Sequence, residues 1–160
     1  MSSKATSKNS YPENLITAVF GQNCNCAYYD INIVNEVIKS FDERDQEIIR
    51  LRYEEKMNYA KIGAKLGLSS TRITQLDYRF RYYARIRYAC YLVDHKVGID
   101  KLGIPTRYAN VLKKNGIETI YDLLGYDKNS LLNLKGIGEV SFKEIVRAID
   151  AQYISTHRFK

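Results

Sequence analysis

Hydrophobic positions recur at helical spacing through most of the sequence after residue 30. The first run of such positions lies between Ile31 and Phe41, and a second follows Asp42 and continues to Tyr53. A spacing of three to four residues is typical of amphipathic helices, and Asp42 is a favourable N-cap residue for the second one. The pattern predicts two successive helices that pack on one another, and an all-α fold.

A third run, over residues 58–76, predicts a helix-turn-helix. Gly67 lies at its centre and can adopt the positive φ of a tight turn, and Ser69 follows as the N-cap of the second helix. Gly63 is expected where the two helices approach most closely. The apolar positions expected to hold the two helices together are Ile62 and Leu66 on the first helix and Ile73 and Leu76 on the second. A helical hairpin that only packs, without binding DNA, is the alternative interpretation.

No helix breaker interrupts residues 70–93, so the second helix is expected to continue through this range. Its expected apolar side consists of Phe80, Tyr83, Ile86, Cys90 and Val93. The remaining positions carry Arg79, Arg81, Arg85 and Arg87, interleaved with Tyr78, Tyr82 and Tyr88. Arginine and tyrosine in this arrangement suit phosphate contact and stacking, and the alternatives are a solvated basic face or a protein-contacting surface.

Residues 97–152 form a second unit of short predicted helices. A first helix is expected to begin at Pro105 or Thr106 and to end at Gly116, and further helices are expected to begin at Thr119 and Asp127. Farther on, Gly136-Ile137-Gly138 joins two apolar-periodic helices, which is the pattern of a helix-hairpin-helix. Its glycines allow backbone N–H groups to approach a phosphate at the start of a helix. A tight turn that needs glycine only for packing is the alternative.

These patterns divide the sequence into four parts. Residues 1–30, rich in Ser, Asn and Lys, are expected to form a flexible arm. Residues 31–96 are expected to form the helix-turn-helix domain and residues 97–152 the second helical domain. Residues 153–160 are expected to form a tail.

Charge favours a polyanionic partner. The 160 residues include 25 Lys and Arg against 18 Asp and Glu, a formal net charge of +7. Nine basic residues lie between Lys56 and Lys96, opposed only by Asp77 and Asp94. A concentrated basic stretch on a predicted helix-turn-helix points to double-stranded DNA.

Other chemistry finds little support in the sequence. The three cysteines, Cys24, Cys26 and Cys90, are expected to be reduced, and their spacing from the two histidines does not match a structural zinc site. No catalytic motif is present, so we expect a protein that is not an enzyme and that has no cofactor, metal or small-molecule ligand. No apolar run approaches the ~20 residues needed to span a bilayer, and the N-terminus does not resemble a secretory signal. We therefore expect a soluble cytoplasmic protein without membrane contact.

Residues 41–85 resemble region 4 of the bacterial sigma-70 family. The resemblance rests on the capped acidic helix ending in IIRLRY, the helix YAKIGAKLG and the segment RITQL. In that family the module reads the promoter −35 element in the major groove and docks on the polymerase flap. The resemblance assigns DNA contact to Ser70, Thr71, Arg72, Thr74 and Gln75, and the arginine pattern adds Arg79. Ser70, Thr71 and Thr74 depart from the usual Arg and Glu, which removes a guanine contact, whereas Gln75 can still pair with adenine.

Residues 97–150 resemble the C-terminal domain of the RNA polymerase alpha subunit, which binds A·T-rich DNA through the minor groove. The matching segments are IDKLGIPTRYANVLKKNGIETIYDLL and LLNLKGIGEVSFKEI. The resemblance implies DNA contacts by Arg107, Asn110, Gly138, Ser141 and Glu144. Gly136 and Val140 replace the Asn and Lys that are common in the family, so weaker DNA binding is expected from this half.

Together the two resemblances predict a sequence-specific DNA-binding transcription regulator. It would act with the RNA polymerase core at promoter DNA, in a bacterial or phage-infected cell and near the nucleoid. The second hypothesis is an interaction protein that docks on RNA polymerase or a sigma factor and modulates initiation without reading DNA. A third, an accessory of a nuclease or repair enzyme, depends on the Gly136 hairpin alone.

Overall fold

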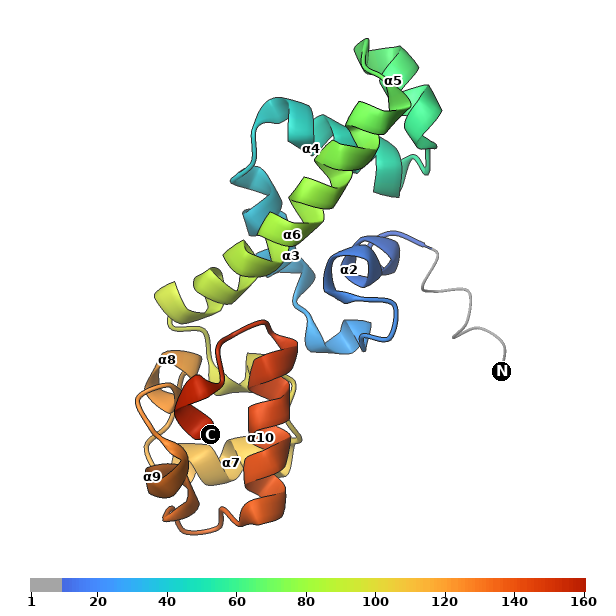
Figure 1. Ribbon diagram of the computed structural model, residues 1–160. Helices are drawn as coiled ribbons and strands as arrows, with labels where there is room; N and C mark the ends of the chain where they lie inside the picture. The colour runs from blue at the N-terminus through green and yellow to red at the C-terminus, as the bar shows by residue number, and fades with distance from the viewer. Residues whose placement is uncertain (1–9) are drawn as a thin grey trace, which may run out of the picture. The chain divides into compact units, whose positions relative to one another are not determined.

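The computed structural model describes residues 10–160, which form helices joined by short turns, with no strand among them (Figure 1). The α-helices are α2 (Glu13–Phe20), α3 (Ile31–Lys39), α4 (Glu43–Ile49), α5 (Tyr59–Leu66), α6 (Ser70–Asp94), α7 (Thr106–Lys114), α8 (Ile120–Leu123), α9 (Lys128–Leu132) and α10 (Glu139–Ala151). A π-helical segment, η2 (Arg50–Glu54), continues α4, and the 3₁₀ segments are η1 (Cys26–Tyr28), η3 (Ile99–Leu102) and η4 (His157–Phe159). The predicted all-α fold is confirmed.

The protein divides into two compact units, and the division falls between Arg85 and Ile86, inside helix α6. This point lies earlier in the sequence than the boundary expected after residue 96. Because α6 is a single continuous helix from Ser70 to Asp94, no linker separates the two units in sequence.

A helix occupies part of the expected N-terminal arm. In α2, Leu15, Ile16, Val19 and Phe20 are buried, at the i, i+1, i+4, i+5 spacing of an amphipathic helix. The Asn14 side chain donates a hydrogen bond of 2.8 Å to the backbone carbonyl of Tyr53, which ties α2 to η2. Residues 10–30 are thus part of the first unit, contrary to the expectation of a flexible arm, and residues 1–9 of that expected arm lie outside the described range.

The buried side of α6 differs from the expected one. Tyr83 and Ile86 are 45% and 42% exposed, and Cys90 is also exposed, whereas Tyr88 is only 1% exposed. The row that is buried consists of Phe80, Ala84, Tyr88 and Leu92. This row repeats every four residues, and the sequence prediction missed it because Ala84 is small and tyrosine suits either a buried or an exposed position.

In the second unit, the helices begin where the capping residues predict. The Thr119 hydroxyl accepts a hydrogen bond from the Asp122 backbone, and the Asp127 carboxylate does the same for Ser130. The shared core consists of Ile99, Leu102, Leu112, Ile117, Ile120, Leu123, Leu131, Ile145 and Ile149, each at most 1% exposed.

The C-terminal residues pack against this unit instead of forming a tail. Phe159 is buried and meets Phe142 edge-on, with 6.3 Å between ring centroids. The Arg158 guanidinium donates a hydrogen bond to the carbonyl of Leu124. Across residues 10–160, no helix combines the length and the apolar character that crossing a membrane requires.

Candidate nucleic-acid interface

The turn between α5 and α6 has the tight geometry of a helix-turn-helix. Gly67 has φ +70°, in the left-handed region, and the Leu68 N–H donates to the Gly63 carbonyl over 2.9 Å. A Cβ atom built on Gly63 would lie only 2.4 Å from the backbone oxygen of Leu68. Position 63 therefore has no room for a side chain, although the closest approach is to the turn and not to the second helix.

A hydrophobic cluster fixes the angle between the helices. It consists of Ile48, Leu51, Ile62, Ile73 and Leu76, with Met57, Tyr59, Leu66 and Leu68 packed around it. Because α4, η2, α5 and α6 all contribute, the cluster holds the first turns of α6 as one rigid body with α5. The predicted inward-facing positions are thereby confirmed.

The sequence-predicted DNA contacts of the first unit come together on the opposite side of this cluster. Ser70, Thr71, Arg72, Thr74 and Gln75 are all exposed in the first two turns of α6. The Ser69 hydroxyl caps the helix by accepting from the Arg72 N–H at 3.1 Å. The Thr74 hydroxyl donates to the Ser70 carbonyl over 2.9 Å, so the helix itself already uses this donor.

Arg79 lies farther along α6 and has a second role in the fold. One of its terminal nitrogens lies 3.9 Å from Oδ2 of Asp45, a carboxylate that is only 5% exposed. Arg44 lies 3.6 Å from the other oxygen of Asp45. Arg79 therefore balances a buried charge as well as being available, on its exposed half, for phosphate contact.

A buried carboxylate on α6 binds two tyrosine hydroxyls from neighbouring elements, a network that the sequence analysis did not predict. Asp77 is 1% exposed and accepts hydrogen bonds from the hydroxyls of Tyr53, at 2.8 Å, and Tyr59, at 2.7 Å. Burial, reinforced by the Asp77 charge, raises the pKa of the Tyr53 hydroxyl well above its ordinary value, and burial also raises the pKa of Tyr59. Both hydroxyls therefore remain donors at all physiological pH values. The one feature of the sequence that could have pointed to this network is the presence of Asp77 within a basic stretch.

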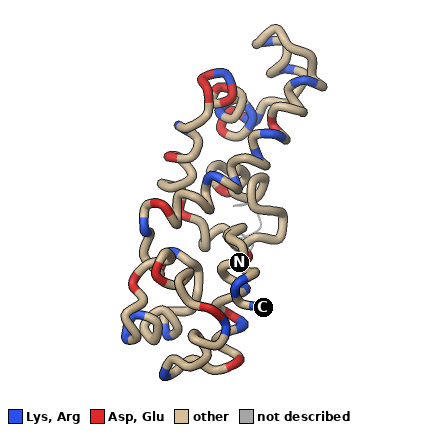
Figure 2. Tube along the Cα trace, turned by 60° about the vertical axis from the view of Figure 1, so that its left-hand side comes forward, with Lys and Arg blue, Asp and Glu red and all other residues tan. Residues whose placement is uncertain are grey.

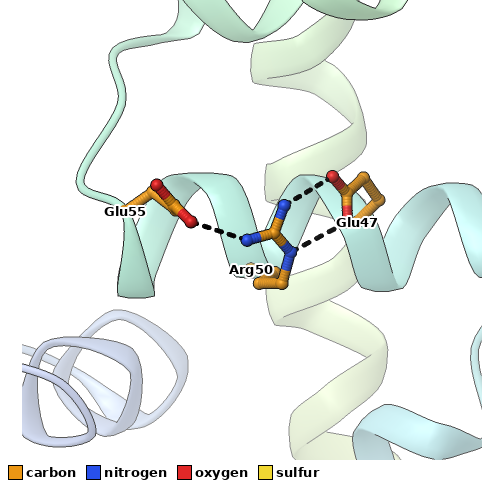
Figure 3. A network of polar contacts seen from close by, with 3 residues as sticks. All are labelled: Glu47, Arg50 and Glu55. Carbon is orange, nitrogen blue, oxygen red and sulfur yellow. Dashed lines mark hydrogen bonds and ion pairs between the residues drawn. The ribbon is translucent and has the colours of Figure 1, made fainter.

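A second polar network closes the loop before α5 (Figure 3). The Arg50 guanidinium binds both carboxylate oxygens of Glu47, at 3.0 and 2.8 Å, and donates to Glu55 over 2.7 Å. The hydrogen bonds from Arg50 lower the pKa of the Glu47 carboxyl, and those to Glu47 and Glu55 raise the pKa of Arg50. The network joins α4, η2 and the residue that follows η2.

Basic positions continue on both helices of the motif. Lys61 and Lys65 are exposed on α5, and α6 adds five arginines. Figure 2 marks the Lys and Arg positions along the backbone in blue. Tyr78 and Tyr82 are also exposed, at 65% and 48%, with Arg81 and Arg85 each 5.8 Å from one of the ring centroids. This exposed surface combines positive charge with aromatic faces.

In the second unit, three of the residues predicted to contact DNA line one pocket and two do not. Arg107, Gly138 and Ser141 line one open pocket of about 490 Å³, together with Tyr108 and Val140. Arg107 is exposed, donates to the Tyr108 hydroxyl over 2.9 Å and lies over that ring. Two other predicted residues do not line the pocket: Asn110, exposed on α7, and Glu144, 3.4 Å from Arg147 on α10.

The start of α10 shows how the hairpin is built. Ser141 is buried. Its hydroxyl accepts a hydrogen bond from the Gly138 N–H over 2.9 Å and donates one to the Gly138 carbonyl over 3.1 Å. Gly136 has φ +92°, and a Cβ there would lie 3.0 Å from Val111 of α7. The Ser141 hydroxyl and the Gly138 N–H therefore serve the helix start, and Val140, 72% exposed, is the side chain that projects outward beside them.

No group of three potential metal ligands occurs among the described residues. Cys24, Cys26 and Cys90 are free thiols. The Cys26 sulfur lies 3.5 Å from the Thr17 hydroxyl, so it joins η1 to α2.

Comparison with known proteins finds two families in one polypeptide. Residues 37–79 match the family described as Sigma-70, region 4, and residues 92–151 match the family of the C-terminal domain of the bacterial RNA polymerase alpha subunit. Both predicted resemblances are confirmed: one segment of the protein matches sigma-70 region 4, and a later segment matches the alpha C-terminal domain. The two family descriptions, a sigma-70 region and a domain of an RNA polymerase subunit, both belong to transcription.

Several similar curated proteins are described as DNA-directed RNA polymerase subunit alpha. That of Chara vulgaris is 36% identical over 58 residues, which cover 36% of this protein and 16% of the relative. That of Marsilea quadrifolia is 45% identical over 51 residues, which cover 32% of this protein and 15% of the relative. That of Angiopteris evecta is 26% identical over 122 residues, which cover 76% of this protein and 32% of the relative. The protein thus spans only a minor part of these relatives' length, and no solved structure matches it significantly.

Proposed function

We propose that the protein is a sequence-specific DNA-binding regulator that works with RNA polymerase at promoter DNA, by binding and not by catalysis. The observation that carries this proposal is the surface formed by the first two turns of α6. Its five polar side chains are exposed, while Ile73 and Leu76 on the reverse side are buried. A helix presented in this way can enter the major groove without disturbing its own support.

We assign sequence reading to Thr71 and Gln75, and backbone contact to Lys61, Lys65 and the exposed half of Arg79. Gln75 can form paired hydrogen bonds with adenine, and Thr71 can contact a thymine methyl group. Lysines on α5 suit phosphates, which position the protein but do not select a sequence.

We assign the second unit to A·T-rich DNA next to the main site. Arg107 supports this assignment because it is exposed beside the hairpin turn, and an arginine can enter a narrow minor groove. Val140 stands at the outward position where a lysine would add charge, so this contact is expected to contribute less affinity than that of α6.

Selection of bound sequences from random duplex DNA tests the proposal, with and without RNA polymerase. The wild-type protein should select a defined motif, and Gln75→Ala should change the preference at one position by about 1–3 kcal/mol. Lys65→Ala is the matched control, because it should weaken all sequences alike and leave the motif unchanged. An identical motif from wild type and Gln75→Ala would contradict major-groove reading by α6.

A second function is favoured by the exposed aromatic residues of α6. Tyr78, Tyr82 and Tyr83 are each at least 45% exposed, and tyrosine is enriched in protein interfaces. An interaction protein that docks on RNA polymerase or a sigma factor would use such a surface. If the random-duplex selection yields no motif but the protein still binds polymerase, this second function replaces the first.

A further inference from the structure

The first unit contains a pocket that the DNA-binding surface does not use. It has a volume of about 490 Å³ and lies between α2, η2, the start of α5 and the middle of α6. Sites for small molecules commonly have about 300–1,000 Å³. The α2 side is formed by Asn14, Thr17, Ala18, Gly21 and Gln22. None of the residues assigned to base reading lines this pocket.

Its charged lining is unbalanced. Arg52, Lys56 and Arg81 face the same space as one carboxylate, Asp77. Both oxygens of Asp77 already accept hydrogen bonds, from the hydroxyls of Tyr53 and Tyr59. The pocket therefore carries an excess of positive charge and a surplus of N–H donors.

The arginines have donor capacity that the fold leaves unused. The Arg81 Nε lies 3.3 Å from Oδ2 of Asp77, yet it has no partner with hydrogen-bond geometry although the atom is buried. Arg52 lies over the Tyr59 ring, 4.2 Å from its centroid, and uses one terminal nitrogen on the Met57 carbonyl over 3.1 Å. Stacking holds the guanidinium in place, which reduces the entropy lost when it binds a ligand.

The third cation is held in an unusual backbone conformation. Lys56 has φ +56°, in the left-handed region that a side chain disfavours. The residues around it are fixed, since Glu55 is bound by Arg50 (Figure 3) and the Met57 N–H donates to the Leu51 carbonyl over 2.9 Å. Strained positions that the surrounding structure enforces cluster at ligand sites, as do π-helical segments such as η2.

We propose that this pocket binds a phosphorylated small molecule, with Arg52, Lys56 and Arg81 contacting its phosphate oxygens. Two arginines and a lysine match the several acceptor oxygens and multiple negative charges of linked phosphate groups. The same phosphate chemistry is also present in the DNA backbone. A pocket of this volume with walls from four helical elements has room for a whole nucleotide-sized molecule, and this favours a free ligand over a single backbone phosphate.

Isothermal titration calorimetry on the full-length protein tests the proposal, with ATP and inorganic pyrophosphate as probes and adenosine as the uncharged comparison. Both phosphate compounds should bind at a single site, and adenosine should not. Lys56→Gln should weaken binding by about tenfold, the effect of one lost charge-assisted hydrogen bond. Lys114→Gln, which removes the same charge from α7 in the second unit, is the matched control and should leave affinity unchanged.

A variant that keeps every charge separates the pocket from general attraction to a basic protein. Ala18→Met places a longer side chain into the α2 wall and should also abolish binding of ATP. The proposal is overturned if neither phosphate compound binds, or if the Lys56 and Lys114 variants lose affinity equally. It is also overturned if Lys56→Gln lowers the salt dependence of DNA binding while the phosphate compounds do not bind, because the pocket would then hold a backbone phosphate. If Lys56→Gln or Ala18→Met loses ATP binding but still selects the same DNA motif as wild type, the result supports the pocket independently of the proposed function.

Discussion

Replacement of Gly63 by alanine should destabilise the helix-turn-helix, although alanine is the better helix former. In the interior of a helix, alanine is favoured over glycine by about 1 kcal/mol. Against this gain, the new Cβ would lie 2.4 Å from the Leu68 carbonyl oxygen, far inside an ordinary contact distance. Leu68 cannot move away freely, since its own N–H is bonded to the Gly63 carbonyl.

Overpacking of this kind costs about 1–3 kcal/mol and occasionally more. The 2.4 Å approach to a backbone atom places this variant at the upper end of that range. Subtraction of the propensity gain then leaves a net loss of about 2 kcal/mol in the free energy of unfolding of the first unit, which raises the opened fraction about 30-fold. Native-state hydrogen exchange of the amides in α5 and α6 measures this loss directly. DNA affinity should fall with it, because the start of α6 would no longer be held in one orientation.

Gly98→Ala is the matched control for this experiment. Gly98 has φ −60°, and a Cβ built on it meets nothing within 4 Å. The same chemical change should there be neutral or slightly stabilising, because alanine restricts the unfolded state. If exchange of the α5 and α6 amides in Gly63→Ala is as slow as in wild type, the steric reasoning is refuted.

Three further predictions concern other parts of the molecule. Arg107→Ala should reduce the preference for A·T-rich flanking DNA in the selection assay without changing the core motif, and an unchanged flank preference would assign this unit to protein contact. Leu15→Ala should lower the free energy of unfolding by about 2–5 kcal/mol in denaturant titration, because Leu15 is fully buried. Backbone N–H groups, that of Thr119 first, hold the pKa of the Asp122 carboxyl below its ordinary value, so its stabilisation is complete above that value and disappears as the pH falls below about 4. Asp122→Asn should flatten that acid limb in pH-dependent thermal melts, and an unchanged limb would contradict the prediction.

The elements set by local chemistry could be predicted from the sequence. Asp42, Ser69 and Thr119 each bond to a backbone N–H three residues later, so a single short motif contains the donor and the acceptor. The turn at Gly67 is likewise a local feature, because its positive φ depends on that residue alone. The exposed residues at the start of α6 follow from the same helical period as the buried ones.

Features that join distant parts of the sequence could not be predicted. The bonds from Tyr53 and Tyr59 to Asp77 span 24 and 18 residues, and no periodicity connects an acid on one helix with hydroxyls on others. Helix α2 could not be predicted for a similar reason: its apolar face is short and lies beside polar residues, and the hydrogen bond that ties it to η2 joins Asn14 to Tyr53, 39 residues later. The pocket depends on both features, which is why the sequence suggested no small-molecule ligand.

The separation of buried and exposed positions on α6 has a consequence for how this protein can diversify. Ile73 and Leu76 hold the helix, whereas Thr71 and Gln75 are exposed and take no part in the core. If the pair reads DNA as proposed, its exchange should retarget the protein to another DNA sequence at almost no cost in folding, since surface substitutions of this kind change stability little. Gly63 allows no such freedom. Proteins descended from this one should therefore keep glycine at position 63, whereas the residues at positions 71 and 75 are free to vary.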